Sequence, residues 1–462
     1  MRVQIRWPQN WLFVLVGVPL FFSMLFIPAS YQLLKGALLV MLLGGIAYGV
    51  ARRHIVFALH PLVLRWVAIL VATGVVFMLW GYWNGAPGAL RVGTVYVLWP
   101  LVFTAFIAVI PSMQMLRTLL GVMTAAGIAL GLYGAMFLAH ATSVLPASMY
   151  IELDQGQAIG LYDGFVEYNM YSISTLFFLL PFFFAALLFW HDEATQSARR
   201  WLWLAYGLCF ALAILSGRRA LWLILAMMPI VYGLFVLPLA RRRWPPRLLW
   251  QGWGSVILSS AGVFLTLKML FDLSPERMFA FLLSGFPAGD PGGDPAGDPG
   301  ASLRSLQAVA LLRGWLASPW SGHGHGAVAD VIRSETMPWA YELQYLAMLF
   351  HTGIVGTLLY AGCIGWVYWQ GLRAIRTSPA HGRILLPLLV GLTCFLIANA
   401  TNPYLLKFDF MWTVFLPLAV INRFLLEDGA NEAPPTSTTR RSMKLLGQRS
   451  ARNEFHAERL AP

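Results

Sequence analysis

Long apolar stretches recur along the whole chain and constrain its fold more than any other feature. Each runs for roughly 18–25 residues, enough for an α-helix to cross the ~30 Å hydrocarbon layer of a bilayer. About twelve can be counted, centred near residues 19, 41, 72, 102, 128, 179, 208, 230, 260, 355, 393 and 415. We expect the first to be retained as a span, because further spans follow it and no small-residue cleavage motif follows Phe26. The sequence therefore predicts an all-α polytopic membrane protein with about twelve transmembrane helices.

Composition supports the membrane assignment and argues against a nucleic-acid partner. Hydrophobic residues make up 58% of the 462, charged residues make up 11%, and the mean hydropathy is +0.67. The net charge of +12 comes mostly from basic residues in alternate connections between the apolar stretches and in the two terminal segments. Because basic residues concentrate on the cytoplasmic side of membrane proteins, we expect both termini there. Residues scattered in this way do not form the basic patch that binds nucleic acid.

Two long outward-facing connections divide the chain into four expected regions. These are N-terminal transmembrane helices over 1–271, with a first outer loop at about 141–168, a long outer loop over 272–339 that contains short helices, C-terminal transmembrane helices over 340–426, and a cytoplasmic tail over 427–462. The tail is polar and basic, so we expect it to be disordered and to contact anionic membrane lipids.

Two segments suggest a metal at first sight, and neither has the spacing of a metal site. The Gly-Asp-Pro repeat at 289–300 matches neither the EF-hand nor the nonapeptide β-roll pattern, and its composition favours a flexible insertion. His323 and His325 form a His-x-His pair without an evident third ligand. The three cysteines lie inside apolar stretches and have no metal or disulfide spacing. We therefore expect neither a metal nor another cofactor.

Arginines on the outer side, where arginine is normally sparse, are the first candidates for ligand binding. Arg218 and Arg219 lie in the sequence SGRRALW between two apolar stretches, where a charge costs a few kcal/mol unless it is paired or hydrated. One interpretation is that they reach the interface or pair with loop carboxylates such as Asp154 or Asp163. The other is that they bind a diphosphate, whose oxygens match the guanidinium fork.

A further arginine is expected on an amphipathic helix over 302–317 in the long outer loop. Arg304 lies on one face of this helix, and Arg313, nine residues later, lies on the opposite face. Only one of them can therefore face a site below the helix. Arg304 by itself is typical of a solvated surface arginine, and above the same end of the bundle it would add a third positive group to Arg218 and Arg219.

Glu342 is the candidate catalytic residue, as a general base that accepts the proton of a sugar hydroxyl. It opens the apolar segment 340–369, where the helix dipole favours a carboxylate and would by itself explain one. Trp339, Tyr341 and Tyr345 flank it. Aromatic side chains at these positions would form a rim around Glu342 and pack against a sugar ring. They are the candidate glycan contacts.

Three short patterns in this order resemble the bacterial O-antigen ligase and polymerase superfamily of membrane proteins. They are SGRRALW at 216–222, LRSLQAVALLRGWLASPWSGHGHG at 303–326 and YELQYLAMLFHTGIVG at 341–356. The resemblance implies metal-independent glycosyl transfer on the periplasmic face of the inner membrane, from a polyprenyl-diphosphate-linked glycan to a hydroxyl of a second glycan. It also implies that Arg218 and Arg304 bind the diphosphate.

The third pattern favours a polymerase over a ligase. In the family it commonly opens with histidine and asparagine, whereas here Glu342 and Leu343 stand at these positions. The missing histidine fits a polymerase of O-antigen, capsule or exopolysaccharide repeat units better than a ligase that transfers the glycan to lipid A-core. A chain-length regulator protein is a further candidate partner.

A transporter or flippase for the polysaccharide is the rival from another class. Transporters place ionisable groups near the middle of the membrane, often on broken helices. The main candidates here, Lys35, Arg65 and Lys268, have no acidic residue beside them in sequence, and the notable charges lie at the outer ends of the apolar stretches. The sequence therefore favours an enzyme.

Overall fold

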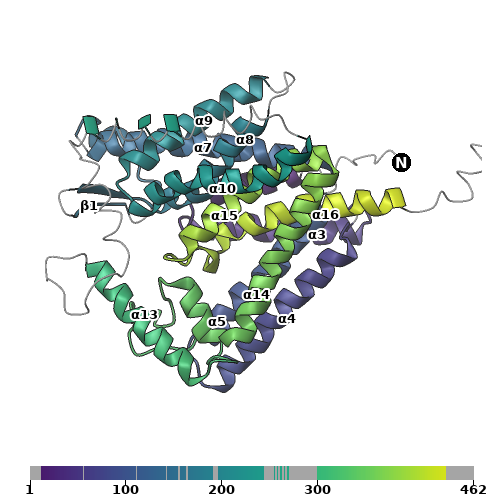
Figure 1. Ribbon diagram of the computed structural model, residues 1–462, viewed down its shortest axis with the longest axis vertical. Coiled ribbons are helices and arrows are strands. Elements are labelled where there is room, and N and C mark those ends of the chain that lie inside the picture. The colour runs from purple at the N-terminus through teal and green to yellow at the C-terminus, as the bar shows by residue number, and fades with distance from the viewer. Residues whose placement is uncertain are drawn as a thin grey trace, which may run out of the picture.

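The structure is a computed structural model in which almost every described element is helical (Figure 1). The described residues are 12–55, 57–110, 112–141, 143–154, 157–162, 165–190, 196–243 and 299–432, together with eight single positions between 254 and 269. The α-helices are α2 (Val18–Phe26), α3 (Gln32–Ala51), α4 (Pro61–Trp83), α5 (Ala89–Gly93), α6 (Trp99–Ala108), α7 (Met113–Ala141), α8 (Leu176–Phe189), α9 (Gln196–Leu215), α10 (Arg219–Arg243), α13 (Pro299–Ala317), α14 (Gln344–Thr377), α15 (Pro379–Asn399) and α16 (Trp412–Glu432). The π- and 3-10 segments are η1 (Phe13–Gly17), η2 (Thr94–Leu98), η3 (Ala147–Met149), η4 (Tyr171–Thr175), η6 (Tyr404–Leu406) and η7 (Phe408–Phe410).

Eight helices in the described part of the chain are long and apolar enough to cross a membrane. They span Gln32–Ala51, Pro61–Trp83, Ala89–Ala108, Met113–Ala141, Tyr171–Phe189, Arg219–Leu237, Gln344–Thr377 and Pro379–Asn399. Each coincides with an expected apolar stretch, so the chain is a helical membrane protein.

Twelve spans are not confirmed. The stretch near residue 19 is the shorter apolar helix Phe13–Phe26. Those near 208 and 415 fall on α9 and α16, whose apolar parts are shortened by charged residues at one end. The stretch near 260 lies mostly outside the described residues.

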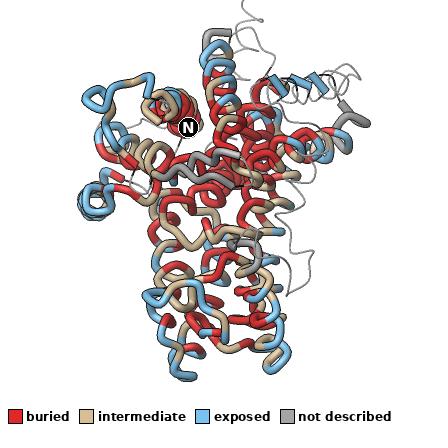
Figure 2. Tube along the Cα trace, turned by 90° about the vertical axis from the view of Figure 1, so that its left-hand side faces the viewer, coloured by how far each residue is buried: buried red, intermediate tan, exposed pale blue. Residues whose placement is uncertain are grey.

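The main core surrounds α8, which packs against α9, α10 and α15. The sequence of α8, LFFLLPFFFAALLF, is apolar on every face, which is typical of a helix surrounded by others. The Tyr171–Phe189 span is accordingly 94% buried, whereas the α3 span is only 22% buried and lies at the periphery. Figure 2 shows the buried residues running through the interior of the bundle.

A second, smaller core holds the long loop that follows α13. α4 and α14 pack together and extend away from the main bundle, and α5 and α13 lie at their far end (Figure 1). The smaller core consists of Ala310, Leu311, Ala327, Ala329, Tyr341, Ala347 and Phe350. It ties α13, the loop 318–343 and the start of α14 into one unit.

The expected regions agree only partly with the observed elements. The first outer loop contains an antiparallel hairpin of β1 (Ala158–Tyr162) and β2 (Phe165–Asn169). α13 covers the segment expected to be an amphipathic helix, and most of the Gly-Asp-Pro repeat lies outside the described residues. α16 continues past residue 427 to Glu432, beyond the expected start of the tail. Ion pairs of Arg423 with Glu427 (2.6 Å) and of Arg373 with Asp428 (2.9 Å) support this extension.

Candidate functional site

The backbone of the GHGHG segment, residues 322–326, lies between α4 and α14 and is hydrogen-bonded to both helices. The His323 and Gly324 N–H groups donate to carbonyl oxygens at the start of α14, at 3.1 and 2.7 Å. The His325 N–H donates to the Phe77 carbonyl of α4 at 2.9 Å. Gly322, Gly324 and Gly326 all have positive φ, between 60° and 87°, which L side chains rarely adopt. The glycines therefore allow the backbone conformation of this segment, and the histidine side chains pack against the neighbouring helices.

A break in α14 completes this junction. Gly353 has φ 60° and ψ −169°, so the helix is interrupted just after Phe350 and His351, which accept hydrogen bonds from the GHGHG segment. The N–H groups of Ile354 and Val355 donate to the Pro319 and Trp320 carbonyls, at 2.9 and 3.2 Å. The loop thus satisfies the backbone groups that the break releases. The start of α14, with Glu342 just before it, is fixed by the loop as well as by its own helix.

Glu342 lies at the centre of a charged cluster that joins three segments. Its Oε2 accepts a hydrogen bond from Arg304 Nε of α13 at 2.6 Å. Its Oε1 accepts from Nη1 of Arg333, which lies in the loop 318–343. The Glu342 side chain is 9% exposed, against 26% for Arg304 and 52% for Arg333. The carboxylate is therefore buried behind two guanidinium groups that reach solvent.

The two arginines of α13 separate as the helical period predicts. Arg304 faces Glu342, whereas Arg313 is exposed. Gln307, one turn after Arg304, is 1% exposed, and neither of its amide atoms has a hydrogen-bond partner among the described residues. The face of α13 that carries Arg304 is thus directed at the start of α14.

A second group of cations lies at the ends of α9, α10 and α15. Arg218 precedes α10, and its Nη1 donates to Ser174 Oγ at 3.5 Å. The Lys407 ammonium lies 5.2 Å from the centre of the Tyr171 ring. Burial lowers the pKa of Lys407, Asp409 raises it, and nearby Arg218 lowers it. Arg219 is the first residue of α10 and is half-buried.

Tyr171 connects the two groups of cations. Burial lowers the pKa of Arg333, and its neighbours act in opposite directions, Arg304 lowering it and Tyr171 raising it. Tyr171 is therefore near Arg333, and its ring is also in contact with the Lys407 ammonium. Pairwise neighbours thus link Arg218 to Lys407, Lys407 to Tyr171, and Tyr171 to Arg333, which lies near Arg304.

Arg333 and Lys407 are residues to which sequence reasoning gave no role. Both belong to the few basic residues that the sequence predicts for the outer, arginine-poor side of the membrane. The uneven distribution of basic residues between the two sides of the membrane was the sequence signal that could have identified them. Neither lies in one of the three family patterns, and their partners are distant in sequence, so their place in the cluster depends on the fold.

The expected aromatic rim is corrected at Tyr341. This side chain is 1% exposed, and its hydroxyl accepts the Ala329 N–H at 2.5 Å inside the smaller core. The ring of Trp339 lies against Gly88, so closely that a Cβ there would come within 2.3 Å of it. Tyr345 is 42% exposed, and its hydroxyl donates to the Leu396 carbonyl at 2.6 Å. Of these three side chains, only Trp339 and Tyr345 keep solvent-accessible surface.

Of the two loop carboxylates named as partners for Arg218 and Arg219, Asp154 is bonded elsewhere. Asp154 is fully buried and accepts from the Ser172 N–H at 2.8 Å and from Ser30 Oγ at 3.3 Å. Burial raises its pKa, and the hydrogen bonds and nearby Lys35 lower it. Asp163 lies outside the described residues.

The two histidines of the GHGHG segment make structural contacts. His323 Nε2 donates to the Gly314 carbonyl at 2.8 Å, and His325 Nε2 lies 3.0 Å from the Tyr360 hydroxyl. The His325 ring also stacks on Tyr96, with centroids 4.4 Å apart. Among the residues that the structure describes, no group of three or more His, Cys, Asp or Glu side chains could hold a metal ion.

The protein should lose stability in mild acid because of His325. Burial, together with nearby His351, holds the pKa of His325 well below its usual 6.5. Below pH 6.5 the unfolded chain binds a proton there that the folded chain does not, so the free energy of unfolding falls as the pH falls. The loss should reach roughly 2 kcal/mol at pH 5.

The measurement is the thermal unfolding midpoint between pH 7.5 and pH 5. His325→Phe keeps a ring beside Tyr96 and cannot be protonated, so the midpoint should depend less on pH than in the wild type. His54→Gln, at an exposed position, is the control and should keep the wild-type pH dependence. Equal pH dependence in wild type and His325→Phe would contradict this assignment.

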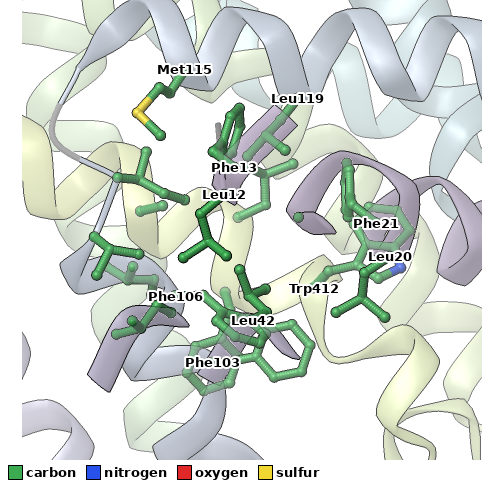
Figure 3. Close-up of a pocket in the computed structure, with 18 of the residues that line it drawn as sticks. Leu12, Phe13, Leu20, Phe21, Leu42, Phe103, Phe106, Met115, Leu119 and Trp412 are labelled. Atoms are coloured by element: carbon green, nitrogen blue, oxygen red, sulfur yellow. The ribbon is translucent and has the colours of Figure 1, made fainter. Parts of the chain in front are cut away.

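An apolar cavity of about 110 Å³ is lined by none of these charged residues (Figure 3). Leu12, Phe21 and Leu42 contribute to its wall from the N-terminal segment, and Phe103 and Trp412 contribute from α6 and α16. Its lining contains no charged side chain. It is suited to hydrocarbon and offers no group for acid–base chemistry, so the charged cluster is the candidate site.

Comparison of the sequence with protein-family models and with curated proteins finds no match.

Proposed function

We propose that this chain is a membrane glycosyltransferase that polymerises polyprenyl-diphosphate-linked oligosaccharide repeat units into O-antigen, capsule or exopolysaccharide. The active site would lie on the periplasmic face of the bacterial inner membrane, with both termini in the cytoplasm. The residue patterns resembling the O-antigen ligase and polymerase superfamily suggest this chemistry. The alternative within the family is a ligase that transfers the glycan to lipid A-core.

One observation carries the proposal. Arg304 and Glu342, which come from the second and third patterns, form an ion pair at 2.6 Å although they lie 38 residues apart. Arg218, from the first pattern, is near Lys407, and Lys407 and Arg333 are both near Tyr171. Basic groups for an anionic leaving group and a carboxylate for a hydroxyl proton therefore occur together, beside helices able to cross a membrane.

The proposed reaction is a displacement at the anomeric carbon of the donor. The oxygen of an acceptor hydroxyl forms the new bond to that carbon, and the bond from the carbon to the diphosphate oxygen breaks. The leaving polyprenyl diphosphate keeps the electron pair, and Arg218, Arg304 and Lys407 stabilise its charge. The Glu342 carboxylate accepts the hydroxyl proton. Trp339 and Tyr345 are the remaining candidates for packing against the sugar.

Arg218→Lys should lower polymer formation strongly while the amount of protein in the membrane stays normal. A lysine keeps the charge but lacks the planar fork that matches diphosphate oxygens. The assay is polymer yield from purified protein with a lipid-linked repeat unit. Arg313→Lys makes the same change on the exposed face of α13 and is the control. Wild-type yield from Arg218→Lys would remove Arg218 from the proposed site.

A flippase is the second candidate, and one observation favours it. Lys35 Nζ and Asp409 Oδ1 form a buried ion pair at 2.9 Å, with side chains only 3% and 4% exposed. Lys35 belongs to the candidate span α3, and buried ionisable pairs in membrane helices are typical of transport pathways. The pair also has a structural explanation, because Asp409 accepts from the Ala29 N–H at 3.0 Å and so ties the connection before α3 to the segment before α16.

Reconstitution into vesicles with a lipid-linked repeat unit separates these functions. Longer lipid-linked glycan supports a polymerase. Transfer only to added lipid A-core, without elongation, supports the ligase. Movement of the repeat unit to the opposite leaflet without any new glycosidic bond would show a flippase and contradict the proposed chemistry.

A further inference from the structure

Arg304 and Arg333 each use a single nitrogen to bind Glu342. Arg304 uses Nε and Arg333 uses Nη1, on opposite oxygens of the same carboxylate. A guanidinium group has five N–H donors, so most donors of both arginines remain for another acceptor. The side chains are 26% and 52% exposed, and these remaining donors are therefore within reach of a ligand.

The cluster carries more positive than negative charge. Two guanidinium groups share one carboxylate, and their proximity is visible in Arg333, whose pKa is lowered by burial and then by Arg304. Tyr171 lies near Arg333, and the Lys407 ammonium lies 5.2 Å from the centre of the Tyr171 ring. A single carboxylate neutralises only one of the two guanidinium charges and accepts from only some of their N–H donors. A diphosphate offers more oxygens and more negative charge in the same space.

We propose that Glu342 is an internal counter-anion that a diphosphate displaces from Arg304 and Arg333, and that Arg333 is a further diphosphate-binding residue. The identification of the anion as the donor's diphosphate rests on the proposed function. The exchange itself is a property of these three side chains. In this exchange, the Glu342 carboxylate competes with the diphosphate for Arg304 and Arg333.

The exchange would impose an order on the reaction. With both oxygens held by guanidinium groups, Glu342 is poorly placed to accept a proton from an acceptor hydroxyl. Once the diphosphate binds the arginines, at least one carboxylate oxygen is released beside the bond that must break. The base is then available only when the donor is present, so the donor binds before the acceptor reacts.

The experiment measures diphosphate affinity in the purified full-length protein. Inorganic diphosphate and farnesyl diphosphate are titrated separately, by calorimetry in detergent, so that the bare anion is distinguished from its lipid-linked form. Glu342→Gln removes the competing charge and should bind both probes at least about fivefold more tightly than the wild type, which is the ratio that ~1 kcal/mol of lost pairing gives. Glu335→Gln is the matched control, because it removes one negative charge from an exposed position of the same loop.

Two further variants test Arg333 and protect against misfolding. Adding Arg333→Ala to Glu342→Gln should abolish the gain in affinity, whereas adding Arg313→Ala should leave it unchanged. Glu342→Asp keeps the charge on a shorter side chain that cannot hold both arginines as Glu342 does, so it should also bind more tightly than the wild type. It replaces Glu342→Gln if that variant does not give a cooperative unfolding transition.

The outcomes separate the exchange from the proposed function. Weaker or unchanged diphosphate binding in Glu342→Gln would overturn the exchange, since it would show that the carboxylate only positions the arginines. An equal gain in Glu335→Gln would also overturn it, because the effect would then be general electrostatics. If no variant binds either diphosphate, both the exchange and the proposed donor site fail. If Glu342→Gln fails to bind more tightly but the wild type still elongates a lipid-linked glycan, only the exchange fails.

Discussion

Gly324→Ala should strongly destabilise the protein, because this glycine lies where two backbones cross. Gly324 has φ +87°, and a Cβ there would lie 2.1 Å from the Gly81 nitrogen of α4. Backbone atoms in a packed helix cannot move aside as a flexible side chain can. The left-handed conformation costs roughly 1–2 kcal/mol and the overlap about 1–3 kcal/mol more. The sum is a large part of the stability of most proteins.

The measurement is thermal unfolding of the purified protein in detergent. Gly365→Ala is the matched control, because Gly365 lies inside α14 with no atom within 4 Å of its added Cβ. This change should be neutral or stabilising by up to ~1 kcal/mol, since alanine favours a helix. A wild-type midpoint for Gly324→Ala would mean that the loop 318–343 does not pass between α4 and α14 as described.

Glu342→Gln should reduce turnover by about 10²–10⁴, the range expected for loss of a general base. Glutamine preserves the size of the side chain, and its single carbonyl oxygen can still accept from one of the two arginines, but it cannot accept the hydroxyl proton. The defect should appear in the rate of glycan elongation at saturating lipid-linked donor. Donor binding should be at least as tight as in the wild type, because the arginines remain and the competing carboxylate charge is gone.

Glu335→Gln controls for the loss of one negative charge and should elongate at nearly the wild-type rate. If Glu342→Gln also keeps the wild-type rate, the carboxylate only holds the two arginines in place. Asp154 is a poor substitute as base, because it is fully buried and bonded to Ser30 and Ser172.

The helical membrane architecture was readable from the sequence, because crossing a bilayer demands long apolar helices. Eight of about twelve expected stretches are helices of the required length and composition, and the period of α13 correctly separated Arg304 from Arg313. The count was less predictable where charged residues shorten a helix, as in α9. Helical period and apolar length are local properties, and a linear sequence contains them completely.

The arrangement of charges depended on the tertiary structure. Lys35 has no acidic neighbour in sequence but pairs with Asp409, 374 residues away. Tyr341 has the sequence position of an exposed rim residue, yet its hydroxyl is bonded to Ala329 in a buried core. Long-range pairing and burial depend on which surfaces meet when helices pack, and no local pattern contains that information.

The sequence by itself determined that this chain is a helical membrane protein and that Arg218, Arg304 and Glu342 belong to its distinctive polar segments. The tertiary structure decided that Arg304 and Arg333 meet on one buried carboxylate. The glycines of the loop explain the difference. Their positive φ values allow the backbone to pass between α4 and α14, and this path fixes the start of α14 with Glu342 beside Arg304 and Arg333.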